Sequence, residues 1–269
     1  VTGGAGFIGS HICDRLIEIG CKVVCMDNLI TGLEGNISHL MEEEGFEFIK
    51  GDITDLEACM EAVSGCDAVS HQAALGSVPR SVADPITTND HNVNGTLNIF
   101  YAAKEAGIKR VVFASSSSVY GDDEGWPKIE HRIGRQLSPY AVTKRMGELY
   151  SDVFNDLFDM EMIGLRYFNI FGPRQSPDGV YAAVVPKFID LIIQGKSPEI
   201  LGDGEQSRDF TFVSNAVDAN LAALTTANTD AFGKSFNIAC GSRMSINEIF
   251  LELRGMISKE IPGVVDIEP

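Results

Sequence analysis

The sequence opens with Val1-Thr2-Gly3-Gly4-Ala5-Gly6-Phe7-Ile8-Gly9, a short apolar strand end that turns through glycines into a helical pattern over Ile8–Ile19. This arrangement is typical of a phosphate-binding loop. Gly3 permits the tight turn, Gly6 keeps a Cβ away from a pyrophosphate, and Gly9 lets the helix pack closely on the sheet. The glycine spacing differs from the common G-x-G-x-x-G, and such loops also merely connect strands to helices, so the loop alone leaves both interpretations open.

An acidic residue at the end of the next strand pattern favours the nucleotide interpretation. The apolar run Lys22–Met26 ends in Asp27-Asn28, about 20 residues beyond the loop, where dinucleotide-binding folds place a ribose-binding carboxylate. Such a carboxylate can accept both ribose hydroxyls and would repel a 2′-phosphate, so NAD is expected rather than NADP. The alternative is that Asp27 only caps the strand. A third run, Phe46–Ile49, leads into Gly51-Asp52-Ile53, which offers an acceptor for an adenine amino group.

Apolar and polar segments then alternate in a βαβ rhythm. Strand patterns lie at Lys22–Met26, Phe46–Ile49, Ala68–His71, Arg110–Ala114 and Glu161–Arg166, and helical patterns lie at Ile8–Ile19, Leu56–Val63, Thr88–Ala106 and Tyr140–Phe158. The sequence therefore predicts an α/β fold: a Rossmann-type, doubly wound parallel sheet with helices on both faces.

Two regions are expected, a nucleotide-binding domain over residues 1–167 and a smaller substrate-binding region over 168–269, part of which returns to the sheet. Prolines and glycines interrupt the second region, and its clearest element is an apolar helix at Val184–Gln194. Only Val1 and Thr2 represent the first strand, although strands usually have about 5 residues. Residues 263–269 resemble a strand that is only beginning, so we expect the chain to be clipped at both ends.

Composition excludes several classes of function. The chain has 269 residues, 44% of them hydrophobic, and can bury a large core, while its net charge of −17 argues against nucleic-acid binding. No apolar run is long enough to span a membrane. The six cysteines lack C-x-x-C spacing and suggest buried thiols in a reducing cytoplasm, and the five histidines form no i, i+4 pair, so no metal is expected.

The candidate chemistry lies in the middle of the chain. The strand Arg110–Ala114 delivers Ser115-Ser116-Ser117-Ser118 to the carboxyl edge of the sheet, and Ser138 and Pro139 then begin a helix. Tyr140 and Lys144 share one face of that helix. A nearby ammonium lowers a phenol pKa from about 10, so Tyr140 could take a proton from an alcohol while a serine hydrogen-bonds the same oxygen. A tyrosine and lysine four residues apart are also common on exposed helix faces.

With these features together, the sequence resembles the extended short-chain dehydrogenase/reductase family, and within it the nucleotide-sugar 4-epimerases. The matching motifs are T-G-G-A-G-F-I-G at 2–9, D-N at 27–28, G-D-I-T-D at 51–55, H-Q-A-A at 71–74, N-V-N-G-T at 92–96, S-S-S-S-V-Y-G-D at 115–122, S-P-Y-A-V-T-K at 138–144, L-R-Y-F-N-I-F-G-P-R at 165–174 and G-D-G-E-Q-S-R-D-F at 202–210. The resemblance implies a retained NAD, oxidation of a sugar C4 hydroxyl and return of the hydride to the opposite face.

The resemblance also implies site residues. Tyr140 is the expected general base, Ser116 shares its proton network, and Lys144 lowers the Tyr140 pKa and holds the nicotinamide ribose. The expected cofactor contacts are Gly3, Gly6, Phe7, Ile8, Gly9, Asp27, Asn28, Asp52, Ile53, Gln72, Ala73, Tyr140, Lys144 and Tyr167. The expected substrate contacts are Ser77, Arg80, Ser116, Ser117, Tyr140, Asn169, Ala183, Val184, Lys187 and Arg208.

Several of these assignments have structural alternatives. Arg80 could only pair with Asp84, Lys187 could lie on an exposed helix face, and Asn169 could cap a turn. Arg208 is the stronger candidate, because a diphosphate on so acidic a chain needs a fixed cation. Related epimerases often have asparagine where this chain has His91, which puts a cofactor role for His91 in doubt.

The expected reaction type follows from the absence of carboxylates in the serine run. Related dehydratases carry Asp-Glu at the places of Ser117 and Ser118, and decarboxylases carry glutamate at the second, so redox epimerisation is the consistent chemistry. Gly76-Ser77 resembles enzymes that act on UDP-N-acetylglucosamine. A UDP-glucuronate 4-epimerase and a non-catalytic nucleotide-binding scaffold are the alternatives. A homodimer is expected through the helices at Thr88–Ala106 and Tyr140–Phe158.

Overall fold

The fold is described from a computed structural model of the chain, covering residues 1–177, 183–200 and 202–268. The chain divides into two compact units. The first unit contains Val1–Tyr167 and Val213–Ile238, and the second contains Phe168–Phe212 and Ala239–Pro269. Each unit has its own hydrophobic cluster.

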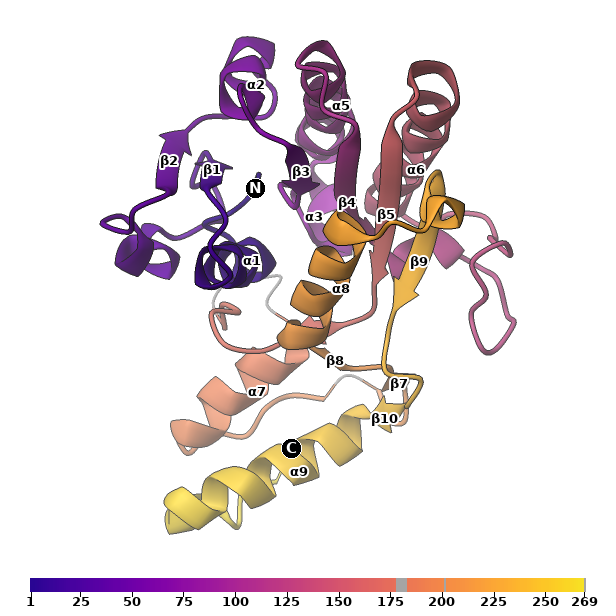
Figure 1. Ribbon diagram of the computed structural model, residues 1–269. Helices are drawn as coiled ribbons and strands as arrows, with labels where there is room; N and C mark the ends of the chain where they lie inside the picture. The colour runs from indigo at the N-terminus through magenta and orange to yellow at the C-terminus, as the bar shows by residue number, and fades with distance from the viewer. Residues whose placement is uncertain (178–182, 201, 269) are drawn as a thin grey trace. The chain divides into compact units, whose positions relative to one another are not determined.

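The first unit is built on parallel strands (Figure 1). They are β1 (Val23–Asp27), β2 (Phe46–Lys50), β3 (Ala68–His71), β4 (Arg110–Ser116), β5 (Glu161–Tyr167) and β9 (Lys234–Ile238). β1 pairs with β2, and β3, β4, β5 and β9 follow one another in that order. Thr2 joins the two groups because it bridges Met26 at one side and His71 at the other. The predicted parallel sheet is therefore confirmed, and β9 is a strand that the sequence pattern did not reveal.

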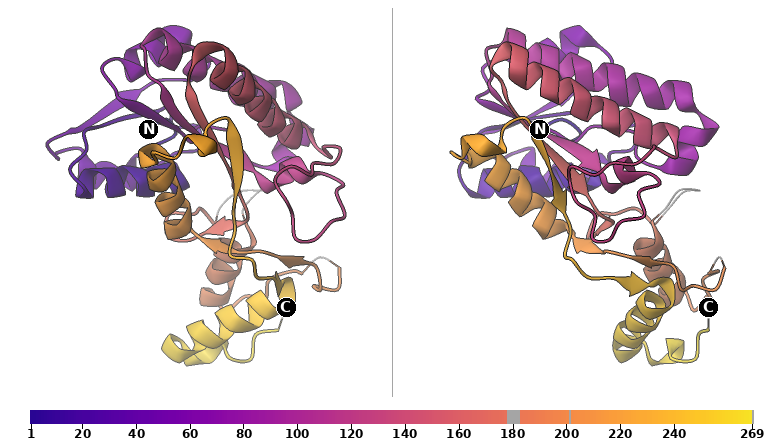
Figure 2. Two further views of the ribbon diagram at one scale, coloured as in Figure 1. Left: turned by 45° about the vertical axis from the view of Figure 1, so that its right-hand side comes forward. Right: turned by 90° about the vertical axis from the view of Figure 1, so that its right-hand side faces the viewer.

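Alternating side chains explain why both faces of this sheet are covered. In β4, Val111 and Phe113 belong to the apolar cluster that also contains residues of α2, α5 and α6, whereas Val112 packs with residues of β5 and α8. Successive residues of a strand point to opposite faces, so a continuous apolar run requires cover on both sides. Figure 2 shows helices on both faces of the sheet.

Several helices of the first unit begin at side-chain caps. The helices of this unit are α1 (Phe7–Glu18), α2 (Leu56–Val63), α3 (Val78–Ala83), α4 (Pro85–Asn89), α5 (Thr96–Glu105), α6 (Pro139–Phe158) and α8 (Val213–Thr225), with short 3-10 helices at Glu34–Asn36, Ser38–Leu40, Ser117–Tyr120 and Thr229–Ala231. The Asp55 carboxylate accepts from two amides at the start of α2, and the Ser138 hydroxyl accepts from Ala141 N at the start of α6. Ser138 therefore caps the helix as predicted.

The helix predicted over Thr88–Ala106 is not one regular α-helix. α4 continues through a π-helical segment, Asp90–Gly95, into α5. π-helical turns are rare and occur frequently at functional sites. This one carries Asn92, whose side chain makes the contacts described below.

The second unit contains short strands and two longer helices. Its elements are β6 (Ile170–Phe171), β7 (Ser207–Arg208), β8 (Thr211–Phe212), β10 (Met244–Ser245), α7 (Val184–Ile193), α9 (Ile246–Glu260) and a 3-10 helix at Pro262–Val264. β6 pairs with β8 in parallel, and β10 pairs with β7 antiparallel. Phe188 on α7 stacks edge-on against Phe250 on α9, with ring centroids 6.2 Å apart.

The expectation of a strand over residues 263–269 is wrong for the part that the structure describes, and Pro269 lies outside that part. Val264 is buried in the cluster formed by α7 and α9. Ile267 N donates to Val264 O, and Arg254 Nη1 donates to Ile267 O at 2.7 Å. The segment therefore turns back onto α9, where its apolar residues find contacts.

Candidate functional site

Backbone packing in the glycine loop explains why each of its three spaced glycines lacks a side chain. Gly3 has φ +67°, and a Cβ on it would lie 2.6 Å from Ala73 N. A Cβ on Gly6 would approach Gly3 O to 3.1 Å, and one on Gly9 would lie 2.1 Å from the same oxygen. Gly9 thus allows α1 to pack against its own loop, a closer partner than the sheet we expected.

The start of α1 fits an anion. Gly6 is the N-cap and no side chain caps the helix, while the first turn, which begins at Phe7 and Ile8, has no acidic residue. The first amides of a helix have no intrahelical partners and carry partial positive charge. The loop and helix start therefore form a cradle that suits the pyrophosphate of a dinucleotide.

Asp27 closes the loop from the end of β1. Its carboxylate accepts from Ala5 N at 3.0 Å and from Leu29 N at 2.8 Å. Burial raises the pKa of Asp27 above its ordinary value, and these two hydrogen bonds offset that rise only in part. Each oxygen keeps acceptor capacity, because a carboxylate offers about four lone-pair sites. Asp27 therefore does hold the backbone at the end of β1, and its carboxylate remains able to accept ribose hydroxyls.

Asn28, Asp52 and Ile53 are brought together because the carboxyl ends of β1 and β2 are adjacent. Asn28 Nδ2 donates to Asp52 Oδ2 at 2.6 Å, and Thr54 N and Oγ1 donate to Asp52 Oδ1. Ile53 is buried. His91 Nε2 lies 3.6 Å from Asp52 Oδ2, so the structure places this departure from the family pattern beside the predicted adenine contacts.

Gln72 and Tyr167 are hydrogen-bonded to each other and to a third residue that the sequence did not indicate. Tyr167 OH donates to Gln72 Oε1 at 2.9 Å, and Asn220 on α8 donates to Tyr167 OH at 2.7 Å. Gln72 Nε2 donates to Asn220 Oδ1. Ala73 N lies 3.4 Å from the Thr2 hydroxyl at the start of the glycine loop. Asn220 is far from these residues in the sequence, and no local motif marks it.

The predicted catalytic side chains form one cluster. Ser116 ends β4, and its hydroxyl lies close enough to Tyr140 on α6 to lower the pKa of that phenol. Ser118 N donates to Ser116 Oγ at 3.1 Å, which leaves the Ser116 proton for the tyrosine oxygen. Lys144 Nζ donates to Ala114 O at 2.9 Å and lies 5.9 Å from the centre of the Tyr140 ring. The surface interpretation of the tyrosine and lysine pair is wrong, because Lys144 is only 9% exposed.

The pKa values of this cluster correct one expectation. Burial raises the pKa of Tyr140 above its ordinary value, and the hydrogen bond from Ser116 lowers it in part. Burial also lowers the pKa of Lys144 to about 8. The predicted lowering of the Tyr140 pKa by Lys144 is therefore not what the structure shows, because loss of hydration dominates at a buried phenol.

Ser77 is the N-cap of α3, and Arg80 lies on that helix. Ser77 has φ +120°, which is strained for a residue with a Cβ, and its hydroxyl accepts from Arg80 N at 3.3 Å. Asn92 holds the segment before α3 in place, because it exchanges hydrogen bonds with Leu75 N and O and donates to Thr143 Oγ1 on α6. Ser117 follows Ser116 directly at the start of a 3-10 helix.

The remaining predicted substrate residues belong to the second unit. Asn169 has φ +31° and donates from Nδ2 to Asp209 O at 3.0 Å, so it does hold a turn. Ala183 and Val184 begin α7, Lys187 is exposed on it, and Arg208 is exposed on β7. The Asp209 carboxylate, which the sequence did not single out, fixes this turn by accepting from the amides of Cys240 and Gly241.

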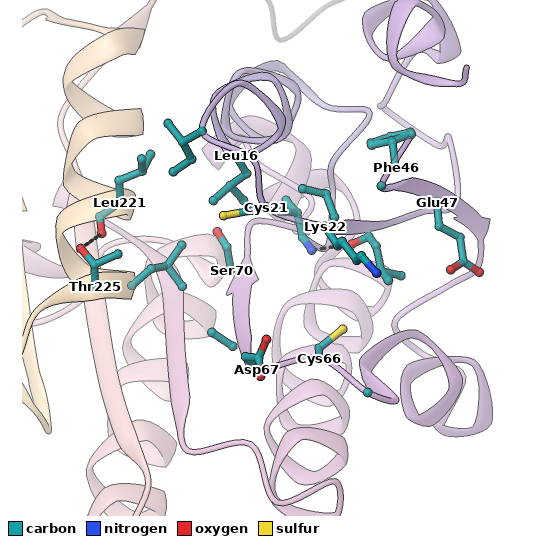
Figure 3. Close-up of a pocket in the computed structure, with 18 of the residues that line it drawn as sticks. Leu16, Cys21, Lys22, Phe46, Glu47, Cys66, Asp67, Ser70, Leu221 and Thr225 are labelled. Carbon is teal, nitrogen blue, oxygen red and sulfur yellow. Dashed lines mark hydrogen bonds between the residues drawn. The ribbon is translucent and has the colours of Figure 1, made fainter. Parts of the chain in front are cut away.

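A cavity of about 700 Å³ lies elsewhere, at the amino ends of β1, β2 and β3 (Figure 3). Leu16, Leu221 and Phe46 contribute apolar walls, and Lys22, Glu47 and Asp67 contribute charge. None of the predicted site residues lines it. Across residues 1–177, 183–200 and 202–268, no group of three or more His, Cys, Asp or Glu side chains is arranged to hold a metal ion. Within the same ranges no helix is long and apolar enough to cross a membrane.

Known proteins match the chain over most of its length. A model described as the NAD dependent epimerase/dehydratase family matches residues 1–239. The UDP-glucose 4-epimerase of Mycolicibacterium smegmatis is 38% identical over 259 residues, which cover 96% of this chain and 82% of that protein.

Solved structures agree. A UDP-N-acetylglucosamine 4-epimerase from Methanobrevibacter ruminantium, in complex with UDP-N-acetylmuramic acid, is 42% identical with a TM-score of 0.89, covering 97% of this chain and 81% of that one. A UDP-glucuronic acid 4-epimerase from Bacillus cereus, in complex with UDP-glucuronic acid and NAD, is 33% identical with a TM-score of 0.88, covering 96% of this chain and 82% of that one.

Proposed function

The chain belongs to the NAD dependent epimerase/dehydratase family, and from this premise we propose that it interconverts the C4 epimers of a UDP-sugar, with UDP-N-acetylglucosamine and UDP-N-acetylgalactosamine as the preferred pair. The observation that carries the proposal is the cluster of Ser116, Tyr140 and the buried Lys144, followed by serines at 117 and 118 rather than carboxylates. Elimination of water would need an additional acid and base there. Bound NAD supplies reversible hydride transfer at the sugar C4, which leaves no net oxidation.

The protein's own groups manage the proton. Tyr140 Oη takes the proton of the C4 hydroxyl and returns it after the keto sugar has rotated to present its opposite face. Ser116 donates a hydrogen bond to the same oxygen. Lys144 is fixed by Ala114 O, so its ammonium is held near the Tyr140 ring, where it would also hold the nicotinamide ribose of a bound NAD. The Ser116 hydroxyl favours the tyrosinate form against the opposing effect of burial.

The cofactor contacts follow from the cradle. The amides at the start of α1 bind the pyrophosphate, and Asp27 accepts from the adenosine ribose. Asn28, Asp52 and Ile53 would hold the adenine end, while Gln72 and Ala73 follow β3 and Tyr167 ends β5 at the same carboxyl edge of the sheet. Their hydrogen bonds to one another support this assignment, because such contacts hold the side chains in one arrangement.

The preference for an acetamido sugar rests on the segment before α3. Gly76 is exposed, and a Cβ on it would have no neighbour within 4 Å, so the segment leaves room beside the Ser77 hydroxyl. Arg80 is half-buried on α3 and could instead pair with a uronate. UDP-glucuronate is therefore the second candidate, and a solved neighbour named for that substrate supports it.

Nuclear magnetic resonance of the anomeric protons tests the proposal with full-length, NAD-loaded protein. We expect UDP-N-acetylglucosamine to convert to its C4 epimer without net consumption of NAD, and faster than UDP-glucose. The Tyr140→Phe variant is the control for chemistry at this site. Accumulation of a 4-keto sugar, release of carbon dioxide, or a clear preference for UDP-glucuronate would contradict the assignment. Absence of any turnover with bound NAD would favour the scaffold alternative.

For the second unit, we propose that Asn169 and Arg208 bind the diphosphate and that Ala183, Val184 and Lys187 contact the nucleotide. Arg208 carries most weight, because a guanidinium can bind phosphate oxygens in two places and the chain has few cations to spare at net charge −17. An Arg208→Met variant should raise the KM for UDP-sugar about 10-fold or more at little changed kcat. An unchanged KM would remove Arg208 from the site.

We also propose a homodimer through α5 and α6. On α6, Leu149, Val153 and Leu157 follow one another at helical spacing and are 44%, 46% and 72% exposed, and Tyr101 on α5 is 42% exposed. An apolar stripe of this kind on neighbouring helices suits a self-complementary contact. Light scattering should give a dimer mass for the parent and a monomer mass for Val153→Glu. A monomeric parent at micromolar concentration would contradict the proposal.

The cytoplasm is the proposed location. All six cysteines are free thiols, and Cys21 and Cys240 are exposed, as is usual in a reducing compartment. Recovery of the protein from the cytosolic fraction of cells would support this placement, and recovery from a secreted fraction would contradict it.

A further inference from the structure

A buried carboxylate that the proposed chemistry does not use lies one helical turn beyond Lys144. Glu148 is 1% exposed, yet its two oxygens accept four hydrogen bonds. Oε1 accepts from Ser115 Oγ at 2.6 Å and from Arg166 Nε at 2.7 Å, and Oε2 accepts from Arg166 Nη2 at 3.0 Å and Arg145 Nη1 at 2.8 Å. These contacts join β4 and β5 to the helix that carries the catalytic tyrosine.

Arg166 extends the network to the other side of the cluster. It is 3% exposed, and its Nη1 donates to Tyr120 OH at 3.0 Å and to Glu130 O at 2.8 Å. Tyr120 OH in turn donates to Asn237 Oδ1 on β9 at 2.6 Å. The network therefore ties the 3-10 helix after Ser116, the segment before α6 and the last strand of the sheet to one ion pair.

Stability alone does not account for such a network. Taking a carboxylate and a guanidinium out of water costs free energy that their attraction repays only in part, and apolar residues of similar volume often stabilise a protein as well. A buried network does fix the relative positions of the elements that it joins. The elements joined here are those that carry Ser116 and Tyr140.

We propose that Glu148 is a positioning residue for the Ser116 and Tyr140 pair, acting through Ser115. Ser115 and Ser116 are consecutive residues at the end of β4, so the bond from Ser115 to Glu148 fixes that strand end against α6. Tyr140 and Glu148 are on the same helix. The distance between the Ser116 hydroxyl and the Tyr140 oxygen is thereby set by Glu148, and Arg166 holds Glu148 in turn. This inference rests on the proposed role of Tyr140.

The test is Ser115→Ala, which removes one hydrogen bond of the network and leaves the ion pair intact. Loss of the Ser116 hydrogen bond should raise the Tyr140 pKa by about 0.5 to 1, because that bond favours the charged phenolate. Titration of 13C-labelled tyrosine in the NAD-loaded protein measures this pKa, and Tyr140→Phe assigns the signal. We expect kcat near neutral pH to fall about 10-fold with an unchanged KM, and the melting temperature to fall by no more than about 4 °C. Ser151 is also a buried serine but lies on α6, and Ser151→Ala is the control that should alter none of these.

A second variant separates positioning from folding. In Glu148→Met with Arg166→Met both charges are removed together, so neither is left buried without its partner. This protein should fold and show the same rise in the Tyr140 pKa as Ser115→Ala. A parent-like Tyr140 pKa in either variant would overturn the proposal, even if kcat falls. If the parent acts on no UDP-sugar, the proposed function fails, while the tyrosine titration still decides the positioning role.

Discussion

The glycine loop and the catalytic cluster use the chain in opposite ways. The loop lies within nine consecutive residues, and its shape depends on atoms that are missing, since a Cβ on Gly3 or Gly9 would strike backbone within 3 Å. The cluster gathers Ser116, Tyr140 and Lys144 from a strand and a helix, and it depends on side chains that are present. The loop should therefore be sensitive to one added methyl group, and the cluster to one removed oxygen.

The largest expected effect is chemical and confined to the cluster. Tyr140→Phe removes only a hydroxyl and should lower kcat by about 10² to 10⁴, the usual scale for loss of a general base. NAD content and the melting temperature should stay close to those of the parent, because the ring is retained. Steady-state kinetics with a cofactor assay measures both. Parent-like turnover would remove Tyr140 from the mechanism and with it the contrast between the two regions.

The loop should show the converse behaviour in Gly9→Ala. The added Cβ would lie 2.1 Å from Gly3 O, and backbone cannot move aside as a flexible side chain can. Overpacking of this kind costs about 1–3 kcal/mol, so NAD should bind about 10- to 100-fold more weakly. Gly35→Ala is the matched control, since a Cβ there has nothing within 4 Å. Calorimetric titration that finds equal NAD affinity in Gly9→Ala and Gly35→Ala would contradict the steric account.

The same contrast explains what the sequence could predict. The glycine loop and the strands predicted between residues 22 and 166 were recognisable because each depends on residues close together in the chain. Each of these strands lies within about two residues of its expected ends, unlike the strand expected over residues 263–269. The direction of the Tyr140 pKa was not recognisable. It depends on how completely α6, β4 and their neighbours exclude water from the phenol, which no spacing of residues reports.

Long-range partners were also beyond the sequence. Asn220 reaches Gln72 and Tyr167 from a helix that follows the second unit's first segment, and Glu148 is one more charged residue on a helix until Ser115 and Arg166 surround it. The π-helical segment that carries Asn92 lies within a stretch that the sequence pattern predicted as one helix. Each of these depends on tertiary packing, which overrides local preference.

A buried histidine beside the glycine loop should give an intermediate effect, visible as a pH dependence of stability. His71 bonds to Thr2 before the loop and to Thr96 on α5, and burial, with the charge of Lys144, lowers its pKa to about 3. The unfolded chain binds a proton near pH 6.5 that the folded chain excludes, so the free energy of unfolding falls as pH drops below about 6.5. Between about pH 7.5 and 5 the loss is about 2 kcal/mol.

His71→Gln should remove that part of the pH dependence, because an amide does not titrate. Urea unfolding at about pH 7.5 and about pH 5 measures the difference for both proteins. The variant should be less stable than the parent at the higher pH, since it loses hydrogen bonds, but its stability should change less between the two. An equal change in both proteins would show that His71 is not the acid-sensitive group.

The smallest effect should come from Asp27→Ala, which tests whether the Asp27 side chain binds NAD or only holds the backbone of the loop. Asp27 holds Ala5 N and Leu29 N and is also the proposed ribose acceptor, so its loss should weaken NAD about 10-fold, or about 1.4 kcal/mol. UDP-sugar affinity should be unchanged. Asp67→Ala makes the same change of charge at the amino end of β3 and should leave NAD binding intact. Asp27→Ala could instead lower the melting temperature and leave NAD affinity equal to that of the Asp67→Ala control. In that case Asp27 only stabilises the backbone, and the amides of the loop bind NAD without it.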